Sequence, residues 1–161
     1  GMGRLGTMVA GYGNHFDMDV IAWDPTLDAE RAASHGVKFV SWDELFSESD
    51  ILSIHVPLTD LSSGWVTARE FGLMKSSAFL VNTSRGPIVD EGALISALSN
   101  GQIAGAALDV YDVEPLPVDH PLLGLDNVLL APHLGYSTVG TIESFMELSL
   151  ENVRGALGDV F

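Results

Sequence analysis

The sequence contains no cysteine among its 161 residues. Disulfides, thiolate nucleophiles and zinc–thiolate sites are therefore excluded, while a reducing compartment is permitted. Long apolar runs are absent as well: runs such as residues 128–131 are far shorter than the roughly 20 residues that span a bilayer. The first residues carry glycines and one arginine rather than the basic and apolar regions of a signal peptide. These features predict a soluble, cytoplasmic protein.

Basic residues are scarce, with 7 Lys and Arg against 22 Asp and Glu, and the formal net charge is −15. A surface this acidic repels phosphate backbones and anionic lipids, so we expect neither nucleic acid nor a membrane as partner. The acids Asp17, Asp19, Glu48 and Asp50 have no His or Cys beside them at ligand spacing. We therefore expect them on solvated faces and expect no metal site.

Apolar runs of strand length alternate with segments of helical character over the whole chain. This alternation is typical of a doubly wound α/β fold, in which helices cover a parallel sheet. With 47% hydrophobic residues, the chain is long enough for one domain, and we assign residues 1–161 to it. The expected strands span residues 19–23, 37–40, 51–56, 78–83, 105–110 and 128–131.

Several polar residues predict where helices begin. Ser41 with Glu44, and Thr67 with Glu70, match the capping box S/T-x-x-E. Asp90 can cap a helix over residues 91–100, which Gly101 can end in the left-handed conformation. A last helix is expected over residues 138–156, beginning at Ser137 or Thr138.

The chain opens with GMGRLG, in which Gly1, Gly3 and Gly6 match the dinucleotide-binding fingerprint G-x-G-x-x-G. This fingerprint places a pyrophosphate at a helix N-terminus, between a strand and that helix. Here the strand before it is missing, and it would be an interior strand of the sheet. We therefore expect a domain truncated by its first strand. Alternatively, Gly1 precedes an initiator methionine, Met2, as a residue left by tag cleavage.

An acid follows the glycines at the expected distance. Asp24 ends an apolar run 18 positions after Gly6, close to the offset at which a carboxylate binds the adenosine ribose hydroxyls. Alone, Asp24 before Pro25 could simply begin a turn. Together with the glycines it predicts a dinucleotide site. An acid there repels a 2′-phosphate, and the next arginine, Arg31, is seven residues away, so NAD is expected rather than NADP.

Four further stretches carry a family resemblance: HVPLT at 55–59, VNTSRGPIVDEGAL at 81–94, GAALDVYDVEPLP at 105–117 and APHLGYST at 131–138. With GMGRLG, they resemble the NAD-binding domain of the D-isomer-specific 2-hydroxyacid dehydrogenases over essentially the whole chain. The resemblance implies a Rossmann-like domain, NAD as cofactor and a small 2-hydroxy or 2-oxo acid as substrate. It also implies a separate substrate-binding domain, which is not in this chain, and a homodimer.

The resemblance also implies roles for individual residues. Arg85 corresponds to the arginine that binds the substrate carboxylate, while Glu114 and His133 correspond to the proton-transfer pair. Asp109 corresponds to a residue near the nicotinamide carboxamide. The remaining cofactor contacts are implied for Arg4 and Leu5 at the pyrophosphate, Val56 and Pro57 beside the adenosine, and Thr83, Ser84 and Gly135 around the nicotinamide.

The chemistry suits these residue types. A guanidinium binds a carboxylate through two parallel hydrogen bonds and keeps its charge. Histidine changes charge near neutral pH, and a carboxylate partner such as Glu114 favours its charged form. Taken singly, Arg85, Glu114 and His133 could each be an ordinary surface residue; together they predict an active site.

The other histidines and the tryptophans have simpler interpretations. We expect His15 and His35 on the surface and His120 exposed in a proline-rich loop. His55 belongs to the HVP stretch, which lines the adenosine site in relatives. Trp23, Trp42 and Trp65 are expected to be packing residues.

Three other functions remain open from the sequence. Some relatives are NAD(H)-responsive corepressors, so a non-enzymatic interaction protein is one alternative, and a catalytically dead NAD-binding remnant is another. Formate dehydrogenases of the same superfamily typically pair the histidine with Gln, whereas this chain has Glu114. Without a substrate domain to close over the nicotinamide, we expect the isolated chain to be inactive.

Overall fold

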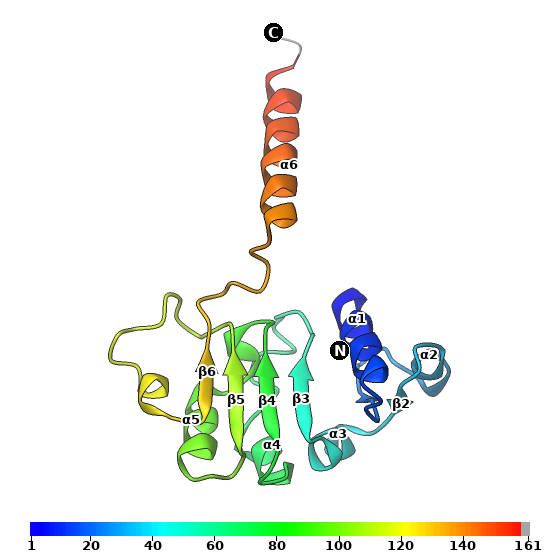
Figure 1. The fold of residues 1–161 in the computed structure, drawn as a ribbon, viewed down its shortest axis with the longest axis vertical. Coiled ribbons are helices and arrows are strands. Elements are labelled where there is room, and N and C mark those ends of the chain that lie inside the picture. Colours follow the sequence, from blue (N-terminus) through cyan, green and yellow to red (C-terminus); the bar gives the residue numbers. More distant parts are fainter. Residues whose placement is uncertain (159–161) are drawn as a thin grey trace.

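The computed structural model is an α/β arrangement, and it describes residues 1–158. Six helices, two short 3-10 helices and six strands alternate along the described chain (Figure 1). The strands are β1 (Ile21–Ala22), β2 (Lys38–Phe39), β3 (Ile51–Ile54), β4 (Phe79–Asn82), β5 (Gly105–Leu108) and β6 (Val128–Leu130). The helices are α1 (Arg4–His15), α2 (Ala29–Ser34), α3 (Trp42–Glu48), α4 (Ala68–Leu73), α5 (Glu91–Ser99) and α6 (Val139–Leu157), with η1 (Gly86–Ile88) and η2 (Pro121–Gly124).

The strands form two parallel sheets, one of order β1-β2 and one of order β3-β4-β5-β6. We call residues 1–40 the two-stranded half and residues 42–130 the four-stranded half. All six expected strands are present, but each is shorter than predicted. The shortest strands are β1 and β2, which have two residues each and pair only with one another among the described residues.

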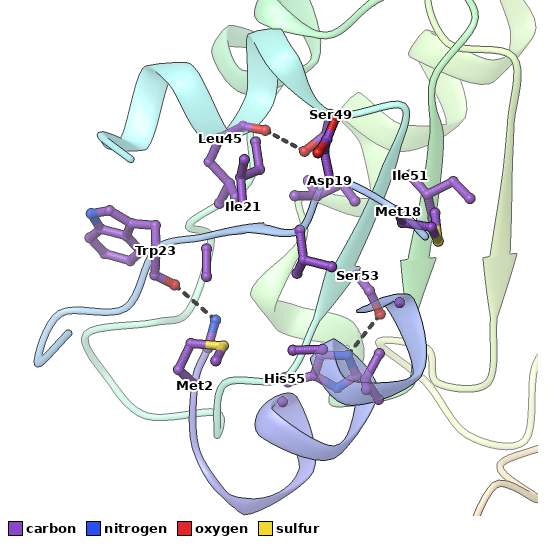
Figure 2. A pocket seen from close by; sticks show the side chains of 18 of the residues that line it. Met2, Met18, Asp19, Ile21, Trp23, Leu45, Ser49, Ile51, Ser53 and His55 are labelled. Atoms are coloured by element: carbon purple, nitrogen blue, oxygen red, sulfur yellow. Dashed lines mark hydrogen bonds between the residues drawn. The ribbon is translucent and has the colours of Figure 1, made fainter. Parts of the chain in front are cut away.

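A cavity of about 620 Å³ separates β1 from β3. In Figure 2, Ile21 and Trp23 lie on the β1 side of this cavity, and Ile51 and Ser53 lie on β3. The facing edges of β1 and β3 have no strand partner within residues 1–158. The sheet is therefore interrupted between β1 and β3.

The helices begin at the predicted caps. Ser41 and Thr67 each form a complete capping box, with Glu44 and Glu70 respectively. The side chain of Asp90 accepts the backbone N–H of Ala93 at the start of α5, and Gly101 follows the helix at φ +63°. Thr138 caps α6, which projects away from the sheets and has no buried residue (Figure 1).

The two halves have cores of different size. In the four-stranded half, a core cluster of nineteen buried apolar side chains packs against the sheet where α4 and α5 cover it, whereas the core cluster of the two-stranded half has six. The predicted packing of the tryptophans is confirmed: Trp23 lies edge-on to Trp42 and Trp65, with ring centroids 4.6 and 5.5 Å apart. These rings join the halves where no strand pairing does.

A buried acid supports the same junction. Glu70 is 5% exposed and accepts hydrogen bonds from the Trp42 indole, the Thr67 hydroxyl and the Arg69 guanidinium. Burial alone would raise the pKa of Glu70, but these bonds outweigh it and lower the pKa from 4.5 to about 2. The carboxylate is therefore ionised in the folded state at neutral pH.

No helix within residues 1–158 has the length and apolar character needed to traverse a lipid bilayer.

Candidate active site

A cavity of about 500 Å³ lies where β3 and β4 end and α1 begins. This is the carboxyl edge of the sheet, where α/β proteins bind their ligands. Eight of the predicted site residues line it together: Gly3, Arg4, Leu5, Val56, Pro57, Thr83, Ser84 and Arg85. Residues from three separate sequence stretches therefore meet at one site.

The first glycines pack too closely for any side chain. A Cβ on Gly6 would lie 1.9 Å from the carbonyl oxygen of Gly1, and one on Gly1 would lie 2.7 Å from the backbone of His55. Gly3, by contrast, faces open space. Gly1 and Gly6 thus hold α1 against the end of β3, which is the packing role of fingerprint glycines, while Gly3 leaves room for a ligand at the helix N-terminus.

The N-terminus of α1 suits an anionic group. No acidic residue occupies its first turn, and Gly3 caps it without a side-chain hydrogen bond. The unpaired N–H groups and the helix dipole favour negative charge at this end. Arg4 adds a positive charge to the same cavity. These features fit the pyrophosphate of a dinucleotide.

Asp24 lies at the end of β1, beside the glycine turn. Its Oδ2 accepts the backbone N–H of Met2 at 3.0 Å, and its Oδ1 accepts the N–H and hydroxyl of Thr26 at 2.9 and 2.7 Å. Partial burial raises the pKa of Asp24, but these hydrogen bonds lower it by more than burial raises it. The net pKa is therefore below its usual value. An ionised acceptor is therefore held in place next to the fingerprint.

Arg31 lies closer to the turn after Asp24 than its separation of seven residues suggested, but within residues 1–158 no ion pair joins its guanidinium to the Asp24 carboxylate. The Arg31 guanidinium donates to the Thr26 hydroxyl at 3.2 Å and to the Met2 carbonyl oxygen at 2.9 Å. Asp28 caps α2 and reverses the chain, so the third residue of that helix returns to the turn after β1. Although Arg31 is seven residues from Asp24 in the sequence, it therefore lies close to the turn after β1 in the fold.

Arg85 follows β4, and the backbone around it is fixed by a buried amide. Asn82 is 1% exposed; its side chain donates to the Arg85 carbonyl oxygen at 2.9 Å and accepts the Ser84 N–H at 3.0 Å. The Ser84 hydroxyl donates to the carbonyl oxygen of Val56, which links the ends of β3 and β4. The Arg85 guanidinium has no carboxylate partner among residues 1–158 and lines the cavity. Its positive charge is available to an acid.

Glu114 and His133 form the predicted pair. Glu114 Oε2 lies 2.7 Å from His133 Nδ1, and Oε1 accepts the Tyr111 N–H at 3.0 Å. The hydrogen bond to His133 lowers the pKa of Glu114, against partial burial, and the Tyr111 N–H and the charges of His133 and Arg85 lower it further.

Asp109, which the family resemblance placed near the cofactor, also holds the backbone that follows His133. Asp109 is 7% exposed, and its two oxygens accept the N–H groups of Leu134 and Gly135 at 2.7 and 2.8 Å. His133 itself has φ +55°, a left-handed conformation that is uncommon for residues other than glycine. Asp109 thus secures the two residues after the strained one and fixes where the imidazole lies.

Tyr111 is a further supporting residue that the sequence analysis missed. Its hydroxyl lies 2.8 Å from the carbonyl oxygen of Ala131, so it joins the end of β5 to the segment before His133. An aromatic residue between the strand and Glu114 was the only available signal, and it does not distinguish a packing ring from a hydrogen-bonded one.

Two other histidines can now be placed. His120 is not exposed as expected: its side chain is 13% exposed and its Nε2 lies 3.0 Å from Glu91 Oε1. The proline-rich loop folds back onto α5, which its composition alone does not reveal. His55 lies behind the glycine turn, with its Nε2 2.9 Å from the Ser53 hydroxyl, and burial lowers its pKa (Figure 2).

A parallel α/β sheet, a glycine turn at a helix N-terminus and an acid after the next strand together define a Rossmann-like dinucleotide-binding domain. Comparison with known proteins narrows this class to one family. The sequence profile of the D-isomer specific 2-hydroxyacid dehydrogenase NAD binding domain matches residues 1–135, and the chain belongs to this family. Its cofactor is NAD.

Known relatives agree with this assignment. The chain is 46% identical over 153 residues to a glyoxylate reductase from Aeropyrum pernix, covering 95% of this chain and 46% of the relative. A D-3-phosphoglycerate dehydrogenase-type oxidoreductase from Ralstonia solanacearum superposes with a TM-score of 0.93 at 37% identity, covering 98% of this chain and 46% of that one. A D-lactate dehydrogenase from Aquifex aeolicus complexed with NAD and lactic acid gives 0.87 at 33% identity, covering 98% and 51%. The chain thus spans about half the length of these relatives.

Proposed function

We propose that the complete protein containing this chain interconverts a small 2-hydroxy acid and the corresponding 2-oxo acid with NAD(H). The observation that carries the proposal is the Glu114–His133 pair, 2.7 Å apart, under the influence of the Arg85 charge. These groups supply a proton donor and a carboxylate anchor. A bound nicotinamide would supply or accept the hydride.

The hydrogen bond to Glu114 leaves one ring nitrogen of His133 for proton transfer with the substrate. Because Nδ1 of His133 is bonded to Glu114, Nε2 is the nitrogen left for the substrate oxygen. In the reductive direction, the imidazolium donates its Nε2 proton to the carbonyl oxygen, and the ionised Glu114 stabilises the charged ring before transfer. In the oxidative direction, the neutral ring accepts the hydroxyl proton. Arg85 holds the substrate carboxylate and so fixes which face of the carbonyl meets the cofactor.

The cofactor would extend between the two halves. Asp24 would accept the adenosine ribose hydroxyls, and Gly1, Gly3, Arg4, Leu5 and Gly6 would hold the pyrophosphate. Val56 and Pro57 would lie beside the adenosine, and Thr83, Ser84, Asp109 and Gly135 would lie around the nicotinamide. The open space at Gly3 and the cavity lined by Arg4, Thr83 and Ser84 support this placement. The ionised Asp24 supports a preference for NAD over NADP, since it repels a 2′-phosphate.

The test is NADH oxidation by the complete protein with glyoxylate, pyruvate and 3-phosphohydroxypyruvate, chosen because the relatives are glyoxylate reductases and phosphoglycerate and lactate dehydrogenases. At least one should be reduced. Substitution His133→Ala should lower kcat about 10²–10⁴-fold while leaving NADH binding unchanged. Full turnover by the His133→Ala protein, or no turnover by the wild type with any 2-oxo acid, contradicts the proposal.

We also propose that residues 1–161 are one incomplete NAD-binding domain and that an extended segment fills the cavity between β1 and β3. The unpaired strand edges on both sides support this, since an interior strand of a parallel sheet needs two partners. The isolated chain should then lack reductase activity. A structure of the complete protein with no strand between β1 and β3 would overturn this part of the proposal.

The same proposal makes the complete protein a cytoplasmic homodimer, as the family resemblance implies. Exposed apolar residues on α6, among them Ile142, Phe145 and Met146, leave surface for such contacts. Sedimentation of the complete protein tests the dimer, and cell fractionation tests the location. A monomer at micromolar concentration, or recovery with the membrane fraction, contradicts the corresponding statement.

A further inference from the structure

The segments that carry the proposed catalytic groups also meet away from those groups. Arg85 leads directly into η1 and α5, and Glu114 lies in the loop over residues 110–120. At the beginning of this loop the two backbones are in direct contact, because a Cβ on Gly86 would lie 2.1 Å from the carbonyl carbon of Tyr111. The position of Glu114 relative to Arg85 therefore depends on how this loop is fastened.

Apart from the bonds of Glu114 and the partly buried Leu116, which packs against the core, the loop is held at its two ends. Tyr111 is 7% exposed and is bonded through its hydroxyl to the Ala131 carbonyl oxygen. Val113 and Val118, within the loop, are 62% and 97% exposed, so they contribute little packing. The second end of the loop is His120. Its contacts decide whether the loop is fixed at one end or at both.

Both ring nitrogens of His120 are in use. The Leu122 N–H donates to Nδ1 at 3.3 Å, so Nε2 carries the ring hydrogen and donates it to Glu91 Oε1 at 3.0 Å. Glu91 is the first residue of α5, and the side chains of His120 and Glu91 are only 13% and 24% exposed. The bond is thus sheltered from water, and it joins the end of the Glu114 loop to the segment that follows Arg85.

The charges nearby fit the same arrangement. Partial burial raises the pKa of Asp112, and the charges of Glu91 and Asp90 raise it further, whereas His120 opposes this shift. Three acids therefore gather where α5 meets the loop. The Nε2–H of His120 is a hydrogen-bond donor directed at one of them, Glu91.

We propose that His120 and Glu91 form a positioning pair, which holds the Glu114 loop against the Arg85 segment and so keeps the Glu114 carboxylate on His133. The inference rests on the proposed function. Neither residue lines the cavity that holds Arg85, so both act through Glu114.

The experiment uses the complete protein with two disruptive and two conservative variants. Glu91→Ala removes the acceptor, and His120→Asn keeps an oxygen for the Leu122 N–H but is too short to reach Glu91. Each should lower kcat about tenfold or more, since small displacements of catalytic groups are costly, while the NADH dissociation constant stays unchanged. Glu91→Gln retains an acceptor oxygen and should keep the wild-type kcat. Asp119→Asn, exposed in the same loop, is the matched control and should do likewise.

Crystal structures of the variants test the positioning role independently of the catalytic activity. In the Glu91→Ala protein, Glu114 Oε2 should lie beyond hydrogen-bond distance from His133 Nδ1. Retention of the 2.7 Å contact or of the wild-type kcat overturns the proposal, as does an equal loss of kcat and NADH affinity, which indicates general misfolding. If the wild type reduces no 2-oxo acid, the proposed function fails, and the crystal structures alone decide whether the pair positions Glu114.

Discussion

The two halves of the molecule differ in the size of their cores and in the functional groups that they carry. The four-stranded half has a core cluster of nineteen buried apolar side chains and four paired strands, and it carries Arg85 and Glu114, while His133 follows directly after its last strand. The two-stranded half has six such side chains, two strands of two residues each, and Asp24 with the glycine turn. A pair of short strands is marginal by itself, so the two-stranded half depends on its contacts with the other. The proposed chemical groups thus sit on the larger core and the cofactor acid on the smaller one.

This division predicts that a change in the proposed chemical groups, as distinct from the cofactor contacts of either half, alters chemistry without altering cofactor binding. The largest effect is expected for Arg85→Ala, which removes the proposed carboxylate anchor. We expect a loss of about 2–5 kcal/mol, or roughly 30- to 5,000-fold in kcat/KM for the 2-oxo acid, with NADH affinity unchanged. Steady-state kinetics and NADH titration of the complete protein measure both quantities. A matching loss of NADH affinity would show that the halves are not functionally separate.

The next effect concerns the junction between the halves and its dependence on pH. The pKa of Glu70 is about 2 in the folded chain and near 4.5 when unfolded, so its stabilisation is fully present above pH 4.5 and is lost as the pH falls through 2. A shift of this size corresponds to about 3 kcal/mol. Urea denaturation at several pH values should therefore show wild type and Glu70→Gln converging in stability as the pH approaches 2. Parallel curves over pH 6 to 2 would refute this role for Glu70.

A smaller effect is expected from the two-stranded half. Asp24→Ala removes charge-assisted hydrogen bonds, so NADH binding should weaken by about 1.5–3 kcal/mol, while kcat at saturating NADH stays close to wild type. The preference for NADH over NADPH should narrow, because Arg31 remains beside the turn without the opposing acid. Fluorescence titration with both cofactors is the measurement, with the exposed acid variant Glu30→Gln as control. An unchanged preference would place cofactor selection elsewhere.

The sequence was sufficient for features that depend on neighbouring residues. The capping boxes at Ser41 and Thr67 were predicted correctly, because each needs only residues three positions apart, and Thr138, which caps α6, was one of the two residues expected to begin that helix. The alternating strands were also found, and only their lengths were wrong. Strand length depends on the partner strand, and β1 has a partner on one side alone.

Features that depend on chain reversal were not predictable. His120 looked exposed and Arg31 looked remote, because each contacts a residue 29 positions away in the sequence, Glu91 and Met2 respectively. The roles of Asp109 and Tyr111 as supports were hidden for a different reason: the same side chain can bind a ligand or a backbone N–H, and only the geometry decides. The residues of the candidate site were predicted through a resemblance, whereas the side chains that support them required the structure.

The smallest expected effect tests the junction directly. Trp23→Leu keeps an apolar side chain but removes two edge-on aromatic contacts, worth about 1 kcal/mol together with the lost area. If the two-stranded half depends on this junction, its amides should respond first: Lys38 and Val40, which donate to Val20 and Ala22, should exchange with solvent faster. The Ala104 and Ala106 amides of the four-stranded half should keep their protection. Phe16→Leu is the control, since Phe16 is 79% exposed in the same half. Equal acceleration in both halves would mean that the chain opens as one cooperative unit, and the difference in core size would then not govern local stability.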